Sequence, residues 1–182
     1  MEKVILLMGV SGSGKTSIGM NLSQHLKCGF NDADEYHSQA NKDKMSSGIA
    51  LTDEDRLPWL QTIHQRIVDL LSSTNSINSK YHVLTCSALK QQYRDILSKG
   101  IDKDKLLIVH LHGSKELIAQ RLVGRNHFFN PKLLDSQFDT LEIPSHQPSN
   151  SYTFYKVEIS NTIEEIVKLI IHDNNLIVHD NN

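Results

Sequence analysis

The segment from residue 9 to residue 16 constrains the fold of this chain more than any other part of the sequence. It reads Gly9-Val10-Ser11-Gly12-Ser13-Gly14-Lys15-Thr16 and matches the pattern GxxxxGK[ST]. The apolar run at residues 4–8 precedes it and predicts a strand buried on both faces of a parallel sheet. Ile18, Leu22 and Leu26 follow it at every fourth position and predict a helix. A glycine-rich segment between a strand and a helix is the setting of a phosphate-binding loop.

The residue types in this loop indicate what it binds. Its glycines let the backbone curl so that successive N–H groups point at phosphate oxygens, and the positive end of the following helix adds to the attraction. Lys15 is expected to reach the β- and γ-phosphates of a nucleotide. The Thr16 hydroxyl is expected to bind Mg²⁺, which prefers oxygen ligands that include phosphates and water. All eight loop residues, from Gly9 to Thr16, are therefore predicted to bind the nucleotide.

Charge and cysteine usage narrow the class of partner. The 182 residues carry 19 basic and 21 acidic side chains, so the net charge of -2 gives no footprint for a nucleic acid or an anionic membrane surface. The two cysteines, Cys28 and Cys86, have no CxxC spacing and suggest neither a disulfide framework nor a zinc site. The apolar run at 4–8 is too short for a signal peptide or a membrane span. We expect a soluble protein in the cytoplasm.

The order of predicted elements indicates an α/β fold. Strands are expected at residues 28–31, 82–86, 106–111 and 155–159 in addition to the first, and helices lie between them. Thr162 and Glu165 form a capping-box pattern before a closing helix. Such alternation predicts a five-stranded parallel sheet with helices on both faces, in three layers. One domain of residues 1–172 is expected, with a mobile lid at about 125–140 and a polar, frayed tail at 173–182.

Two acidic residues follow the second predicted strand and would lie near the phosphates. Asp32 and Asp34 sit at the carboxyl edge of the sheet, and their spacing in an extended segment would place both on one face. One carboxylate could hold a Mg²⁺-bound water while the other accepts the proton of an attacking hydroxyl. The residues themselves do not decide which carboxylate does which, and a pair of solvated loop carboxylates is the alternative.

Basic residues near the ends of predicted elements suit phosphoryl transfer. Such groups can bind an anionic acceptor and neutralise charge on the phosphoryl group in transit. For most of them an exposed surface cation is the alternative, but Arg125 opens the lid segment. The five candidates are Arg56, Lys90, Arg94, Arg121 and Arg125.

Several strings of the sequence, in this order, resemble the gluconokinases. The resemblance covers roughly residues 3–171, and the string at residues 86–90 is among its most specific parts. The matching strings are Met8 to Lys15, Asp32-Ala33-Asp34 with Tyr36-His37, Leu51-Thr52-Asp53 through Asp55-Arg56 to Pro58-Trp59-Leu60, Cys86-Ser87-Ala88-Leu89-Lys90 with Tyr93-Arg94-Asp95, His127-Phe128-Phe129, and Gln137 to Glu142.

The resemblance implies a P-loop kinase fold, ATP-dependent phosphorylation of D-gluconate to 6-phospho-D-gluconate, and commonly a homodimer. It implies that Asp34, Arg56 and residues 90–94 face the acceptor, and His127 in the lid is a further candidate for substrate binding. His37 follows the acidic cluster and is also a candidate substrate contact, with a loop histidine bonded to water as the alternative. Asp32 would lie near the metal. Arg121 would lie near adenine, and Arg125 would reach the phosphates when the lid closes.

Other acceptors and another class of protein remain as alternatives. The shikimate kinases usually have three glycines after the third strand, where this chain has Cys86-Ser87-Ala88, which disfavours shikimate. From a different class, the chain could be a nucleotide-dependent binding protein or switch that keeps the fold without transferring phosphate to a metabolite, but the intact set of Lys15, Thr16, Asp32 and Asp34 speaks against it. His110 and His112 have a spacing that can hold a metal, but no third ligand stands nearby in the sequence, so packing or solvent exposure is the better interpretation.

Overall fold

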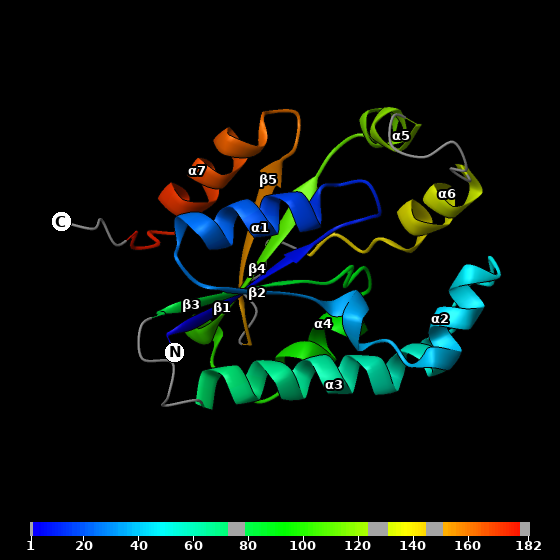
Figure 1. Cartoon of the computed structure of the whole chain (residues 1–182), viewed down its shortest axis with the longest axis horizontal. Coiled ribbons are helices and arrows are strands. Elements are labelled where there is room, and N and C mark those ends of the chain that lie inside the picture. Colours follow the sequence, from blue (N-terminus) through cyan, green and yellow to red (C-terminus); the bar gives the residue numbers. More distant parts are fainter. Residues whose placement is uncertain (1, 73–78, 124–130, 145–150, 179–182) are drawn as a thin grey trace.

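A parallel sheet forms the centre of the protein. The computed structural model describes residues 2–72, 79–123, 131–144 and 151–178 (Figure 1). Within them, five strands pair in the order β2-β3-β1-β4-β5, and every neighbouring pair is parallel. The predicted fold class is confirmed. The strands are β1 (Lys3–Met8), β2 (Gly29–Asp32), β3 (Tyr81–Thr85), β4 (Leu106–His112) and β5 (Thr153–Glu158).

Helices cover both faces of the sheet and extend past its carboxyl edge. In Figure 1, α1 and α7 lie above the sheet and α3 and α4 below it, while α2, α5 and α6 lie to the right, the side where β1 ends. Two short 3₁₀ turns, η1 (Ala33–Tyr36) and η2 (Lys103–Lys105), complete the described elements. The helices are α1 (Lys15–His25), α2 (Gln39–Ser46), α3 (Asp53–Ser72), α4 (Gln91–Ser98), α5 (Lys115–Val123), α6 (Pro131–Thr140) and α7 (Ile163–Asp173).

The central strand divides the core into two halves, because successive side chains of a strand point to opposite faces. Ile5 and Leu7 of β1 pack with apolar residues of α1 and α7. Val4, Leu6 and Met8 pack with residues of α3 and α4. All five side chains are fully buried, which is the burial expected of a central strand in a sheet covered on both faces.

Two helices and the end of the chain differ from the sequence prediction. The helix α2 is mostly polar, and its two apolar residues, Ala40 and Met45, form no apolar stripe that periodicity could reveal. In α6, Leu134 is buried and Phe138 is packed against the same core, a helical spacing inside the segment interpreted as a lid without a clean period. The tail is not frayed at its start, because Leu176 is buried and the N–H of Ile177 donates to the Tyr81 hydroxyl at 3.0 Å.

Buried histidines are expected to make the fold sensitive to acid. Burial lowers the pKa of both His82 and His110 to about 4. An exposed histidine titrates near about 6.5, so the unfolded chain binds protons that the folded chain excludes. The free energy of unfolding should therefore fall as the pH drops from about 6.5 to about 4, by on the order of 2 kcal/mol per buried histidine. Urea unfolding at several pH values measures this fall.

A variant at one of these positions tests the assignment. The His110→Phe side chain cannot be protonated, and it would lie among apolar residues that include Phe154. We expect its free energy of unfolding to fall less steeply over the same pH range. An unchanged slope would contradict a role for His110 in the acid sensitivity.

Candidate active site

The phosphate-binding loop connects β1 to α1, and its backbone conformation at Gly12 and Gly14 requires glycine. Gly12 has φ of 81°, and a Cβ atom there would lie 2.6 Å from Cγ of Leu122 in α5. Gly14 has φ of 94° and is the residue from which α1 begins. Side chains other than that of glycine rarely adopt such φ values, so these residues fix the curl of the loop. The loop lies at the start of α1, where backbone N–H groups lack helical partners.

Lys15 folds back over the loop. Its Nζ donates to the carbonyl oxygen of Gly9 at 2.9 Å and to that of Val10 at 3.2 Å. Burial lowers the pKa of Lys15, and the nearby charge of Asp34 opposes that change. The cation therefore lies within the loop and within the field of the acidic turn.

Thr16 and Asp32 connect the loop to the neighbouring acidic turn. The Thr16 hydroxyl donates to Oδ2 of Asp32 at 2.9 Å. Oδ1 of Asp32 accepts from the backbone N–H of Asp34 at 3.1 Å and so caps η1. A hydroxyl and a carboxylate lie side by side, which are oxygen ligands of the kind that Mg²⁺ prefers. Among the described residues, no group of three or more His, Cys, Asp or Glu side chains could hold a metal ion by itself.

Asp34 lies in a 3₁₀ turn, so the expectation of an extended segment is wrong. The cap provided by Asp32 lets the chain turn immediately after β2. The Asp34 side chain is 83% exposed, and its Oδ1 lies 4.0 Å from Nε2 of His37. The His37 ring is buried and stacks on Trp59 with ring centroids 4.2 Å apart. Nε1 of Trp59 donates to the carbonyl oxygen of Ala33 at 2.8 Å, so α3 holds the turn that carries Asp34.

A second polar cluster lies where α3 and α4 begin. Nζ of Lys90 donates to both carboxylate oxygens of Asp53, at 2.8 and 2.7 Å. Asp53 also accepts from the Tyr93 hydroxyl and from Nε2 of Gln92. The hydrogen bond from Lys90 is the largest of the contributions that lower the pKa of Asp53 to about 2. The guanidinium of Arg56 lies 5.9 Å from the centroid of the Tyr93 ring, so two of the candidate cations border one cluster.

The other candidate cations lie elsewhere. Arg94 is 1% exposed, and its guanidinium donates to the carbonyl oxygens of Ala88, Leu89 and Glu142. The Arg94 guanidinium is therefore bonded to backbone within the protein and is not exposed to a ligand. Arg121 in α5 donates to the carbonyl oxygen of Ile159, just after β5. Two candidates, Arg125 and His127, lie outside the described residues, and of the expected lid the structure describes residues 131–140, which form α6.

Residues that could tempt a chemical interpretation pack instead. His110 is buried against Phe154 and His112 lies 3.8 Å from Glu158, which agrees with the interpretation as packing or solvent exposure. Burial raises the pKa of the Cys86 thiol to about 12, which leaves it without nucleophilic character at neutral pH.

Sequence reasoning gave no role to two residues that the structure brings to the site. Gln137 of α6 bonds to Ser11 of the phosphate-binding loop, and Glu142 bonds to the backbone at the start of α4. Both lie in the string from Gln137 to Glu142 that carries part of the family resemblance. That string was the available signal.

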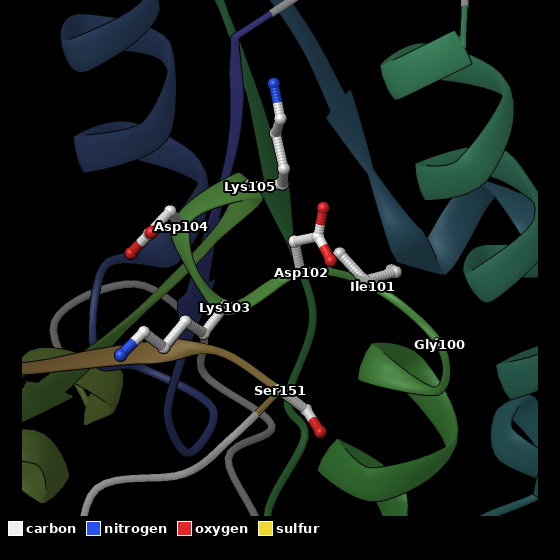
Figure 2. Close-up of a pocket in the computed structure, with 7 residues that line it drawn as sticks. All are labelled: Gly100, Ile101, Asp102, Lys103, Asp104, Lys105 and Ser151. Atoms are coloured by element: carbon white, nitrogen blue, oxygen red, sulfur yellow. The ribbon is translucent and has the colours of Figure 1, made fainter.

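A hollow at the amino ends of β4 and β5 is a weaker candidate for a functional site. It is lined by residues of the loop around η2 and by Ser151 (Figure 2). Lys103 and Lys105 point in different directions there and do not converge on a common point. The hollow lies at the edge of the sheet opposite the phosphate-binding loop.

Comparisons with known proteins agree with the geometry. The family model described as shikimate kinase matches residues 11–173. A probable gluconokinase of Dictyostelium discoideum is 51% identical over 170 residues, covering 93% of this chain and 84% of that protein. A gluconokinase of Arabidopsis thaliana is 42% identical over 182 residues, covering 93% and 90%. The crystal structure of a gluconokinase from Sinorhizobium meliloti 1021 superimposes with a TM-score of 0.81 at 36% identity, covering 96% of this chain and 92% of that one.

Proposed function

This chain belongs to the gluconokinases, small P-loop kinases within the shikimate kinase family, and on that premise we propose that it phosphorylates D-gluconate with ATP. The products are ADP and 6-phospho-D-gluconate. One observation carries the proposal: the hydrogen bond between Thr16 and Asp32 joins the phosphate-binding loop to the turn that bears Asp34. A phosphoryl donor in the loop and a hydroxyl beside Asp34 would then be neighbours.

The nucleotide side of the reaction uses the loop and the cations around it. The loop N–H groups would hold the β- and γ-phosphates, and Lys15 would leave the carbonyl oxygens of Gly9 and Val10 to reach them. The Lys15 ammonium is already bonded to two carbonyl oxygens, and phosphate oxygens could take their place. Arg121 on the adenine side and Arg125 at the phosphates stay as predictions from the family resemblance.

The residues at the loop fit Mg²⁺. Thr16 and Asp32 would hold the ion, with the remaining ligands supplied by phosphate oxygens and water. The chemistry that such an ion supplies when bound is neutralisation of charge on the β- and γ-phosphate oxygens.

On the acceptor side, we assign Asp34 as the general base. Both oxygens of Asp32 are engaged, by Thr16 and by the backbone N–H of Asp34, whereas the Asp34 carboxylate is exposed and open to a ligand. The substrate oxygen bonds to the γ-phosphorus, the bond between that phosphorus and the bridging oxygen of ADP breaks, and Asp34 takes the proton of the hydroxyl.

The carboxylate of gluconate needs a cation, and among the candidate cations that the structure describes, Arg56 and Lys90 are partly exposed and lie around the Tyr93 ring. His37 lies beside Asp34 and could contact a substrate hydroxyl. Arg94 is buried, so we assign it an indirect part: it holds the carbonyl oxygens of Ala88 and Leu89 in the segment just before Lys90.

A coupled assay of ADP release tests the function. Purified protein with MgATP should turn over with D-gluconate and much more slowly with shikimate, other sugar acids or nucleosides, by at least about a hundredfold in kcat/KM, because an acceptor that cannot pair its charge and hydroxyls leaves buried or ordered polar groups unmatched. Omission of the acceptor is the control. ADP release that does not depend on an acceptor would support a nucleotide hydrolase or switch instead. Turnover with shikimate and not with gluconate would make shikimate the substrate.

Two more expectations from the sequence stay predictions. Sedimentation of the purified chain tests the homodimer that the family resemblance implies, and microscopy of a tagged chain tests the cytoplasmic location. Within the described residues, no helix has the length and apolar character needed to cross a bilayer.

A further inference from the structure

A side chain from α6 holds the tip of the phosphate-binding loop. The Oε1 atom of Gln137 accepts from the backbone N–H of Ser11 at 2.6 Å, and its Nε2 donates to the Ser11 hydroxyl at 3.0 Å. A glutamine amide offers an acceptor and a donor side by side, so both ends of one side chain are used on one residue of the loop. The two residues are 126 positions apart in the sequence.

The contact lies at an exposed point of the loop. Ser11 itself is exposed, and the N–H of Ser13 closes the turn by donating to the carbonyl oxygen of Val10 at 3.2 Å. On one side of this turn, Leu122 packs against Gly12. Gln137 braces the turn at Ser11, next to the N–H groups that the proposed function assigns to the phosphates.

The segment that carries Gln137 is fixed to the rest of the protein on both sides of this residue. Leu134 of α6 is buried in the core on the α1 side of the sheet. After the helix, the N–H of Glu142 donates to the carbonyl oxygen of Leu89 at 2.9 Å, and Oε2 of Glu142 accepts from the N–H of Gln91. These two bonds flank Lys90. The helix that holds the loop is therefore anchored beside the proposed acceptor cation.

We propose that Gln137 is a positioning residue, which holds the tip of the phosphate-binding loop in the conformation that receives the terminal phosphates of the nucleotide. The proposal rests on the proposed function only in taking the loop as a nucleotide site, and not on gluconate as acceptor. The opposite possibility is that the Gln137 oxygen occupies a donor that phosphate must claim. That arrangement would make Gln137 a competitor of the nucleotide. When Gln137 is replaced, the positioning role predicts a lower nucleotide affinity and the competing role predicts a higher one.

A substitution that keeps the length and helix-forming tendency of Gln137 separates these outcomes. Gln137→Met removes both hydrogen bonds, and we expect the affinity for a fluorescent ADP analogue to fall about tenfold, as for the loss of two neutral hydrogen bonds. Gln65→Met is the matched control, because Gln65 lies on α3 and its amide bonds to Asp69 at the surface. Thermal unfolding of each variant shows whether the fold is retained.

Two more variants show whether the effect passes through Ser11. Ser11→Ala removes only the hydroxyl, and when it is combined with Gln137→Met the loss of affinity should be smaller than the product of the two single losses. Gln137→Glu can still accept from both the N–H and the hydroxyl of Ser11. The measurement is made in high salt, which screens the added negative charge of the glutamate. Under these conditions Gln137→Glu should lose less affinity for the analogue than Gln137→Met does.

The nucleotide measurement is made without an acceptor, so its outcome is separate from that of the gluconate assay. Affinity of Gln137→Met within twofold of the wild type would overturn the proposal, and tighter binding would show that Gln137 competes with the phosphates. Losses that multiply independently in the double variant would also overturn it. A wild type that binds the analogue but does not phosphorylate gluconate would refute the proposed substrate and leave the Gln137 proposal standing.

Discussion

Replacement of Lys15 by alanine should lower kcat by at least about a hundredfold, the range found when one preorganised charge stabiliser is removed from an active site. The ammonium lies within the loop, bonded to the carbonyl oxygens of Gly9 and Val10. Negative charge shifts toward the leaving phosphate during transfer, and a cation fixed beside it stabilises the transition state more than the ground state. The same burial that lowers the pKa of Lys15 also strengthens its interaction with a phosphate.

The fold should survive this change. Lys15 makes its hydrogen bonds within the loop, and alanine favours the first turn of α1 as well as lysine does. Lys105→Ala is the matched control, since Lys105 is exposed in the hollow at the other edge of the sheet (Figure 2). Rates from the coupled assay and circular dichroism of both variants make the comparison. A Lys15→Ala enzyme that works within tenfold of the wild type would remove Lys15 from the mechanism.

The parts of the fold that local sequence determines were predictable. β1 and the phosphate-binding loop are specified by an apolar run, three glycines and the residues directly after them, all within 14 consecutive positions. The capping box at Thr162 is likewise local, and both of its reciprocal hydrogen bonds are present. Such patterns act through the residues that carry them, so no knowledge of the rest of the chain is needed.

The parts that depend on contacts between distant segments were not predictable. The pairing of Lys90 with Asp53 spans 37 positions, and nothing in the sequence around either residue indicates it. Asp32 caps η1 and turns the chain where we expected an extended segment. Arg94 resembled an exposed acceptor cation because a buried arginine has no sequence signature of its own, and only the three carbonyl oxygens around it show why it is buried.

These tertiary contacts change how the acidic residues should be compared. Asp53 stands at the start of α3, but its carboxylate bonds to Lys90, Gln92 and Tyr93 at the start of α4 and orients these three side chains. Asp34 makes few bonds to the protein and faces solvent, where an acceptor would lie. One carboxylate is used to hold other residues and the other is free to act on a ligand.

Asparagine at each position should therefore give different kinetics. Asp34→Asn removes a proton acceptor while keeping the size of the side chain, and it should lower kcat by roughly a hundredfold or more, as for the loss of a general base. Asp53→Asn keeps one acceptor oxygen for Lys90 or Tyr93, so it should leave kcat within about tenfold and mainly raise the KM for gluconate. Steady-state rates over a range of gluconate and ATP concentrations separate the two parameters. Equal losses of kcat in the two variants would mean that the base lies elsewhere, because the exposed position of Asp34 and the bonded position of Asp53 would then make no difference to the chemical step.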